Sequence, residues 1–229
     1  MNTALLIGCG SKFGLSLQQN LLSNGWAVNS ISGTPSTETH HLLNHLVIDW
    51  KKFTVADLEK FLKNQSNIDL VFFNQNSSAL SSNTFKINNY STLELWKQEK
   101  TWAQCYFTSC ILPFHIIHSL QHRCTSETKV AWMLSSFVHS HSDINHADYI
   151  GNKYQNYLIM RNFSLNHTGC FFGINPESLD NINLKDGIDK LTATINQPSH
   201  TLNGRVVFFD GTSDKKFNLF ESNTKDVHC

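Results

Sequence analysis

Short apolar runs alternate with longer amphipathic stretches along most of this 229-residue chain. Several runs are apolar at every position instead of at alternate ones, which is typical of strands covered on both faces. The pattern predicts strands at Ala4–Ile7, Ala27–Ile31, Leu46–Ile48, Asp69–Phe73, Lys129–Leu134, Cys170–Ile174 and Gly204–Phe209.

Between these runs, apolar residues recur at helical spacing. Helices are predicted over Leu15–Leu22, Phe53–Leu62, most of Ser91–Leu120 and Tyr149–Phe163. Gly25 is placed to cap the first helix, and Pro113 predicts a turn or kink within the third. The repeated order of strand and helix predicts an α/β fold: a Rossmann-type, doubly wound parallel sheet of about seven strands with helices on both faces.

The length suits one domain spanning residues 1–229, because no linker or internal repeat interrupts the pattern. Residues Ser213–Cys229 are polar and are expected to form a loosely ordered tail.

Charge and hydropathy exclude several classes of function. Lys and Arg total 18, as do Asp and Glu, so there is no electrostatic case for binding nucleic acid or an anionic membrane. No apolar run approaches the roughly 20 residues that span a bilayer, and the N-terminus lacks the features of a signal peptide. We therefore expect a cytoplasmic protein, in which the six cysteines are reduced and mostly buried.

The first strand runs into a glycine-rich segment that opens a helix. A pyrophosphate binds backbone N–H groups at such a helix start, and glycine permits the tight turn and the close approach. The segment predicts a dinucleotide-binding loop formed by Gly8, Gly10, Ser11, Lys12, Phe13 and Gly14. An ordinary glycine-rich turn is the alternative. Ser16 stands where the last fingerprint glycine would be, and Lys12 could contact a phosphate or lie in solvent.

Further motifs follow in an order that resembles the short-chain dehydrogenase/reductase family, with this chain as a divergent member. Tyr149 and Lys153 form a YxxxK motif, and Ser136 precedes Tyr149 by the family's usual spacing. Other matches to the family's cofactor-binding positions are the glycine loop, Asp49 near the adenine, Asn74 in the Asn-Asn-Ala-Gly turn, and Pro176 after the sixth strand.

The resemblance implies an NAD(P)-dependent oxidoreductase that transfers hydride between a nicotinamide cofactor and a carbonyl or alcohol substrate. Tyr149 would be the acid/base, Lys153 would favour ionised tyrosine and bond the nicotinamide ribose, and Ser136 would hold the substrate oxygen. The alternative for these three residues is a tyrosine and a lysine on a helix surface and a serine at a strand end.

The chain also departs from the family. No asparagine occupies the helix before Pro113, where the family often has one, and Gln104 is the nearest amide. The segment after Pro176 is short, so the expected substrate lid is small. These departures favour an alternative function, that of a non-catalytic dinucleotide-binding sensor or scaffold on the same fold.

The end of the second strand bears on the cofactor. NAD-binding Rossmann sites place an acidic residue there for the ribose 2′-hydroxyl, and here that position falls at Ser32. Since no carboxylate would repel a 2′-phosphate, the sequence favours NADP over NAD.

Two helices indicate assembly, because family members pair through the helices corresponding to Cys105–Leu120 and Tyr149–Phe163. One face of each cannot bury all their aromatic residues, which include Phe107, Phe114, Tyr154, Tyr157 and Phe163. A homodimer or homotetramer is expected.

Histidines occur in two groups. His139, His141 and His146 would border the substrate pocket or face solvent. His115, His118 and His122 could share a helix face and bind zinc. No cysteine or carboxylate completes a recognised pattern, so an incidental surface, without metal, is the favoured interpretation.

Overall fold

The computed structural model describes residues 1–50, 52–65, 67–75, 103, 106–134, 147–176 and 184–208. The strands are β1 (Thr3–Ile7), β2 (Ala27–Ser32), β3 (Leu43–Val47), β4 (Leu70–Phe73), β5 (Lys129–Met133), β6 (Cys170–Asn175) and β7 (Val206–Phe208). The α-helices are α1 (Lys12–Ser23), α2 (Val55–Phe61), α4 (Leu112–Leu120), α5 (Ala147–Asn166), α6 (Leu184–Ile195) and α7 (Ser199–Leu202). A π-helix, η2 (Phe107–Ile111), precedes α4, and a 3₁₀ turn, η3 (Gln121–Arg123), follows it.

The strands form one parallel sheet in the order β3-β2-β1-β4-β5-β6-β7. This confirms the predicted fold class. The chain starts at β1, winds outward to β3, and then crosses to β4 on the other side of β1. Because the winding direction reverses between β1 and β4, a crevice opens at their carboxyl ends, where such folds bind ligands.

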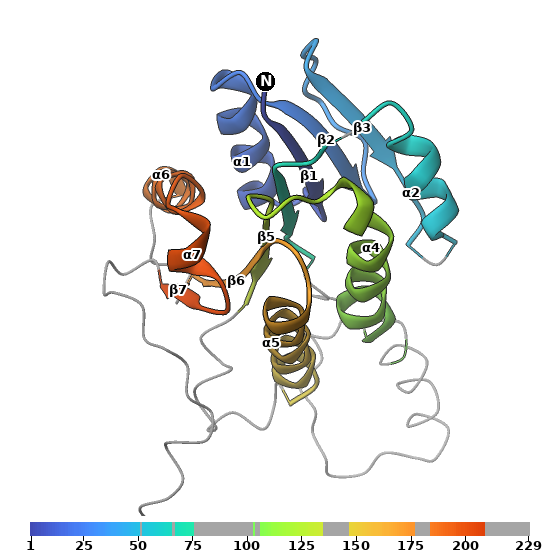
Figure 1. The fold of residues 1–229 in the computed structure, drawn as a ribbon. Helices are drawn as coiled ribbons and strands as arrows, with labels where there is room; N and C mark the ends of the chain where they lie inside the picture. Colours follow the sequence, from blue (N-terminus) through green and yellow to red (C-terminus); the bar gives the residue numbers. More distant parts are fainter. Residues whose placement is uncertain are drawn as a thin grey trace, which may run out of the picture.

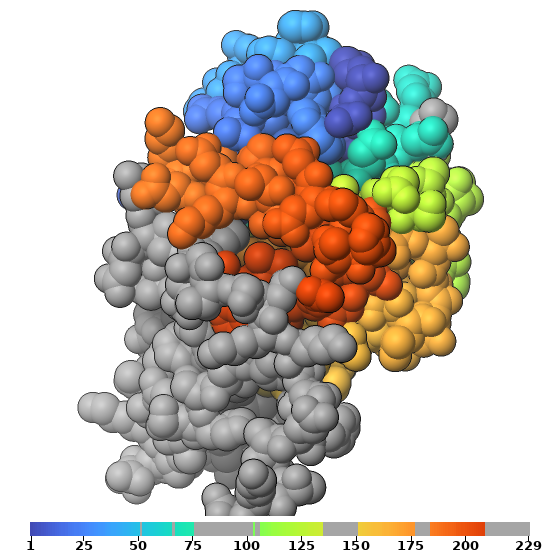
Figure 2. Space-filling view, turned by 60° about the vertical axis from the view of Figure 1, so that its left-hand side comes forward, coloured from blue at the N-terminus to red at the C-terminus, as the bar shows by residue number. Residues whose placement is uncertain are grey.

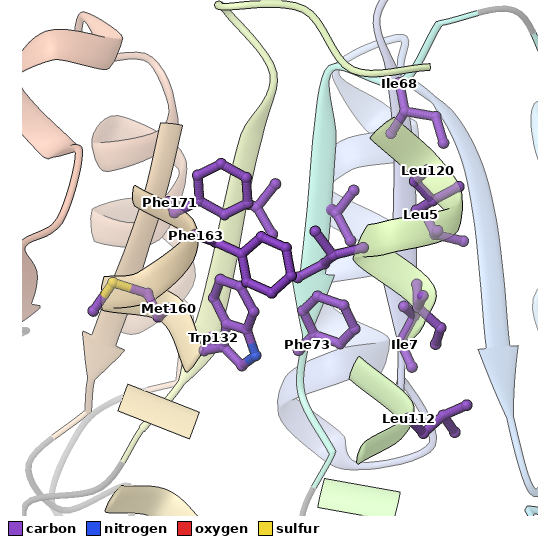
Figure 3. Close-up of a cluster of buried hydrophobic side chains, with 14 of the residues drawn as sticks. Leu5, Ile7, Ile68, Phe73, Leu112, Leu120, Trp132, Met160, Phe163 and Phe171 are labelled. Carbon is purple, nitrogen blue, oxygen red and sulfur yellow. The ribbon is translucent and has the colours of Figure 1, made fainter. Parts of the chain in front are cut away.

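Helices cover both faces of the sheet (Figure 1). Helices α1, α6 and α7 pack on one face, with Leu17, Leu191 and Leu202 among the buried residues. Helices α2, α4 and α5 pack on the other, where a dense aromatic cluster forms around Phe73, Trp132, Phe163 and Phe171 (Figure 3). Phe73 and Trp132 stack with ring centroids 5.1 Å apart. The continuous apolar strands predicted from the sequence are thus buried on both sides.

Local sequence signals set the ends of α1. The Ser11 hydroxyl caps the start by accepting from the Gly14 N–H at 3.2 Å, as N-cap serines do. At the other end Gly25 has φ +77°, a conformation that favours glycine. Gly25 therefore ends the helix as predicted.

The structure corrects four expectations. Strand β3 is Leu43–Val47 instead of Leu46–Ile48, because it is an edge strand with half-exposed side chains and no clear apolar run. Helices α6 and α7 were not predicted. Pro113 starts no turn, since it lies in the first turn of α4 directly after η2. Tyr157 and Phe163, which were expected to need a partner subunit to bury them, are already buried within this chain.

Helix α6 completes the layer beside α1, and Figure 2 shows it in orange next to the blue N-terminal elements. The Thr192 hydroxyl on α6 donates to the Asn20 side chain on α1 at 3.0 Å. No helix within the described residues is long and apolar enough to cross a membrane.

Candidate functional site

The glycine loop leaves β1 at the crevice and makes very close backbone contacts. Gly8 has φ +81°, and a Cβ there would lie 2.9 Å from the Cα and N of Gln75, just after β4. A Cβ on Gly14 would lie 2.6 Å from the Cys9 Cα. Both positions therefore require glycine for steric reasons, and α1 starts as close to the loop as two backbones can approach.

Asn74 joins the two strands at the crevice. Its side-chain amide donates to the Gly8 carbonyl at 3.1 Å and to the Ser11 hydroxyl at 2.8 Å. Since Asn74 follows β4 and Gly8 follows β1, these two bonds fix the loop against the neighbouring strand. The helix cap of α1 is part of the same network, because Ser11 also accepts from Gly14.

The start of α1 has the properties of an anion site. A helix N-terminus presents unpaired N–H groups and a partial positive charge, and the first turn of α1 contains no acidic residue. Ser11 and Lys12 are exposed there. Phe13 packs its ring against Phe72, with centroids 6.3 Å apart, so it offers a ligand its backbone and not its side chain. Together with the glycine cradle, these residues fit a dinucleotide pyrophosphate.

The end of β2 carries a hydrogen-bond network that the sequence did not predict. His45, on β3, has its Nδ1 2.6 Å from the Ser30 hydroxyl and its Nε2 3.1 Å from the Thr34 carbonyl. The Ser32 hydroxyl also donates to the Thr34 carbonyl, at 2.5 Å. The buried polar residues of β2, Asn29, Ser30 and Ser32, indicate that polar partners lie nearby, but they do not identify His45 as one of them.

Asp49 and Trp50 follow β3. Asp49 is exposed and lines an open cavity of about 580 Å³ between β3 and α2, which no glycine-loop residue lines. Trp50 lies against the turn after β2, because a Cβ on Gly33 would be 3.2 Å from its Nε1. Trp50 is thus an aromatic side chain beside the turn after β2.

Lys153 is buried beneath the carboxyl ends of β4 and β5. Only 4% of it is exposed. Its ammonium donates to the Met133 carbonyl at 2.7 Å and to the Gln75 carbonyl at 3.4 Å. Burial lowers the pKa of Lys153 to about 8, opposed by the nearby Cys110 thiol. The lysine therefore lies at the same crevice as the glycine loop, because Gln75 contacts both.

The π-helix η2 packs beside Lys153. The Cys110 thiol donates to the Asn152 carbonyl at 3.5 Å, and burial raises the pKa of Cys110 to about 12. The Gln75 side-chain amide is also buried, and neither its oxygen nor its nitrogen has a hydrogen-bond partner among the described residues. An ordered water or the polar group of a ligand would satisfy such an amide.

The remaining predicted residues are only partly placed. Tyr149 lies on α5, four residues before Lys153, and its side chain is outside the described part. Helical spacing puts the two residues on one face. Pro176 is buried directly after β6. Outside the described residues lie Ser136, Gln104, His139, His141, His146 and the tail from Ser213.

The three histidines around α4 are on the surface. His115, His118 and His122 are all exposed, and the His118 ring lies parallel to that of Phe114, with centroids 6.5 Å apart. The described residues contain no group of three or more potential metal ligands. The four described cysteines, Cys9, Cys110, Cys124 and Cys170, are unbridged thiols.

No protein-family model and no curated protein matches the sequence. Solved structures do match. A carbonyl reductase from Pseudomonas aeruginosa in complex with NADP gives a TM-score of 0.73 at 17% identity, covering 92% of this chain and 97% of that one. A short-chain dehydrogenase/reductase from Brucella ovis gives 0.70 at 14%, covering 91% and 99%. A short-chain dehydrogenase family protein from Francisella tularensis gives 0.70 at 12%, covering 91% and 96%. The chain thus has the fold of short-chain dehydrogenases/reductases, as its motifs predict.

Proposed function

We propose that this chain is an NAD(P)-dependent oxidoreductase of the short-chain dehydrogenase/reductase type, acting on a small carbonyl or alcohol. The observation that carries the proposal is the buried Lys153 ammonium, bonded to the Gln75 carbonyl while Gln75 also backs Gly8 of the glycine loop. Burying a cation costs desolvation free energy, so a buried lysine is rare unless it serves structure or function. Its place at the crevice of a dinucleotide-binding fold supports a catalytic role.

Each group of residues at the site would have its own role in binding or catalysis. The α1 start and glycine loop would bind the pyrophosphate, and Lys153 would bond the nicotinamide ribose. Tyr149 would exchange a proton with the substrate oxygen, helped by the adjacent ammonium, and Ser136 would orient that oxygen. The bound nicotinamide would supply or accept the hydride.

NADP is the proposed cofactor over NAD. Strand β2 ends at Ser32, the position where NAD-binding Rossmann sites have a carboxylate. The NADP complex of the Pseudomonas aeruginosa carbonyl reductase supports the same preference. Titration of both cofactors tests it, and clearly tighter binding of NAD would contradict it.

A homodimer or homotetramer is also proposed, through α4 and α5. Phe114 on α4 is 43% exposed, and Leu158 and Leu165 on α5 are 39% and 73% exposed. Large apolar side chains on neighbouring helices favour a partner surface. Light scattering at micromolar concentration tests the proposed assembly, and a monomeric mass would contradict it.

Tyr149→Phe is the experiment that tests the catalytic proposal. Small ketones, aldehydes and alcohols are first screened with both cofactors. The variant keeps the ring and loses the hydroxyl, so cofactor binding should persist while turnover falls about a hundredfold or more. Tyr154→Phe, on the same helix, is the matched control and should keep its rate. Full turnover by Tyr149→Phe would refute the mechanism.

The alternative function, a non-catalytic sensor or scaffold, needs only the glycine loop, whose bonds to Asn74 and Ser11 are complete. It predicts cofactor binding without turnover across the whole panel. That outcome would replace the enzymatic proposal.

A further inference from the structure

The turn after β2 is the part of this fold that meets the adenosine ribose, and His45 controls its hydrogen bonds. His45 is on β3, and its imidazole reaches across to β2 and to Thr34. A carbonyl oxygen can only accept, so the Nε2 facing Thr34 carries hydrogen. Nδ1 then accepts from the Ser30 hydroxyl when the ring is neutral.

The Thr34 carbonyl is fully used by this arrangement. It accepts from the Ser32 hydroxyl at 2.5 Å and from His45 Nε2 at 3.1 Å, which accounts for the two lone pairs of a carbonyl oxygen. The Ser32 hydroxyl oxygen is also occupied as an acceptor, because the Thr34 N–H donates to it at 3.2 Å and His45 Nε2 lies 3.4 Å from it. The turn therefore has no free acceptor for a ribose hydroxyl in these two groups.

Donors, in contrast, remain available at the same turn. The Thr34 hydroxyl lies beside the glycine loop, since a Cβ on Gly10 would be 2.8 Å from its Oγ1. Neither this hydroxyl nor the Gly33 N–H forms a hydrogen bond among the described residues. The first carboxylate along the turn, Glu38, accepts from Gln19 of α1 at 3.1 Å.

We infer that His45 is a specificity-determining residue that makes this turn select a ribose 2′-phosphate over a 2′-hydroxyl. A phosphate dianion accepts hydrogen bonds and needs donors, whereas a hydroxyl pair also needs an acceptor. By holding the Thr34 carbonyl, His45 removes the acceptor that NAD would use. The inference rests on the proposed function, because it assumes that the adenosine ribose binds at the end of β2.

Substitutions at His45 separate this role from a purely structural one. Gln can place an amide N–H near the position of Nε2 and still donate to Thr34. Asn is too short to reach Thr34, although its oxygen can accept from Ser30. His45→Gln should keep the wild-type preference for a 2′-phosphate over a 2′-hydroxyl. In His45→Asn this preference should fall by about fivefold to tenfold, which is the effect of one hydrogen bond. His41→Phe is the control, because His41 stacks on His40 outside the network.

The measurement is the ratio of dissociation constants for adenosine 5′-monophosphate and adenosine 2′,5′-bisphosphate on the full chain, repeated with NAD and NADP. A ratio that falls in His45→Asn and not in His45→Gln or His41→Phe supports the inference. Equal weakening of both nucleotides in His45→Asn, or an unchanged ratio, overturns it. If the wild-type chain binds none of the four, the proposed function fails, and that result is visible before any variant is made.

Discussion

The two helices that border the site shape it by different physical means. At the α1 side, Gly8 and Gly14 leave no room for a Cβ, and Asn74 and Ser11 satisfy each other and the loop. These contacts are neutral hydrogen bonds and backbone packing. None of them depends on a group that titrates near physiological pH.

At the α5 side, a charge is buried beneath the carboxyl ends of the central strands β4 and β5. The Lys153 ammonium is bonded to the backbone carbonyls of Met133, on β5, and Gln75, after β4, and desolvation lowers its pKa to about 8. The α1 side should therefore respond to added volume and not to pH, whereas the α5 side should respond to pH and to loss of charge. Each of the following changes tests one half of this contrast.

Gly8→Ala should have the largest effect. The substitution forces a residue with a Cβ into φ +81° and brings that Cβ to 2.9 Å from Gln75 backbone atoms. We expect the free energy of unfolding to fall by about 2–4 kcal/mol, and binding of NADP to be lost. Urea unfolding and cofactor titration measure both.

Gly10→Ala is the control for this prediction. The one close contact of a Cβ at Gly10 would be with the Thr34 hydroxyl, at 2.8 Å, since the Ser32 atoms lie at 3.7 Å or more, and the Thr34 side chain can rotate. The variant should fold with nearly normal stability. If both variants unfold at the same urea concentration, steric closeness at Gly8 is not what defines the α1 side.

Lys153→Met should reveal the titration of the α5 side. The unfolded lysine keeps its proton up to its ordinary pKa of 10.5, while the folded one loses it near 8. Between these values the unfolded chain binds more protons, so the free energy of unfolding rises with pH. The rise approaches about 1.4 kcal/mol per pH unit and is absent in the variant.

Buried thiols make the free energy of unfolding fall as the pH rises, which opposes the effect of the lysine. The lysine contribution must therefore be obtained by comparison with the variant. The pKa of Cys110 and of Cys170 is raised to about 12, and that of Cys124 to about 11, all by burial. Thiols of the unfolded chain ionise from about 9, so they lower stability above that pH. The difference between wild type and Lys153→Met, followed from pH 7 to 10 by urea unfolding, isolates the lysine. Parallel curves for the two proteins would show that Lys153 does not titrate in this range.

Much of the fold could be predicted because its signals are local. The run Ala4–Ile7, the glycine loop and the Gly25 cap are adjacent in sequence and specify one β–α unit. Helix α6 was missed although Leu184, Ile188, Leu191 and Ile195 follow helical spacing. Gly187 and the threonines lower helix propensity there, and the packing of its apolar residues against α1 and the sheet compensates for it.

The site was less predictable because it depends on register. The YxxxK spacing singled out Lys153, but its carbonyl partners are Gln75, after β4, and Met133, at the end of β5, both far away in sequence. His45 meets Ser30 because these two residues are partners in the β2–β3 pairing. Since the predicted third strand began at Leu46, His45 lay outside it, and no sequence pattern could have paired the two.

Asn74→Ala tests the hydrogen bonds of the α1 side without adding volume. It removes the bonds to the Gly8 carbonyl and the Ser11 hydroxyl, and should lower the free energy of unfolding by about 1–2 kcal/mol. Ser11→Ala should lower it by about 1 kcal/mol through loss of the cap. The double variant should lose less free energy of unfolding than the two single variants added together, because Asn74 and Ser11 share a hydrogen bond. Full additivity in urea unfolding would show that the Ser11 cap and the Asn74 hydrogen bonds stabilise the loop independently.

The smallest effects come from two glycines with open space around them, one at the end of α1 and one on α5. Among the described residues, and apart from the local backbone, no atom lies within 4 Å of a Cβ built on Gly25 or Gly151, but only Gly25 of the two has a positive φ, +77°. Gly151→Ala should therefore raise the free energy of unfolding by about 0.5–1 kcal/mol, since alanine favours a helix interior. Gly25→Ala should lower it by about 1 kcal/mol, because the left-handed conformation is strained for alanine. Thermal and urea unfolding of the two variants measure the pair. Shifts of the same sign would mean that backbone conformation does not set the difference between these positions, and the steric account of the α1 side would lose its simplest support.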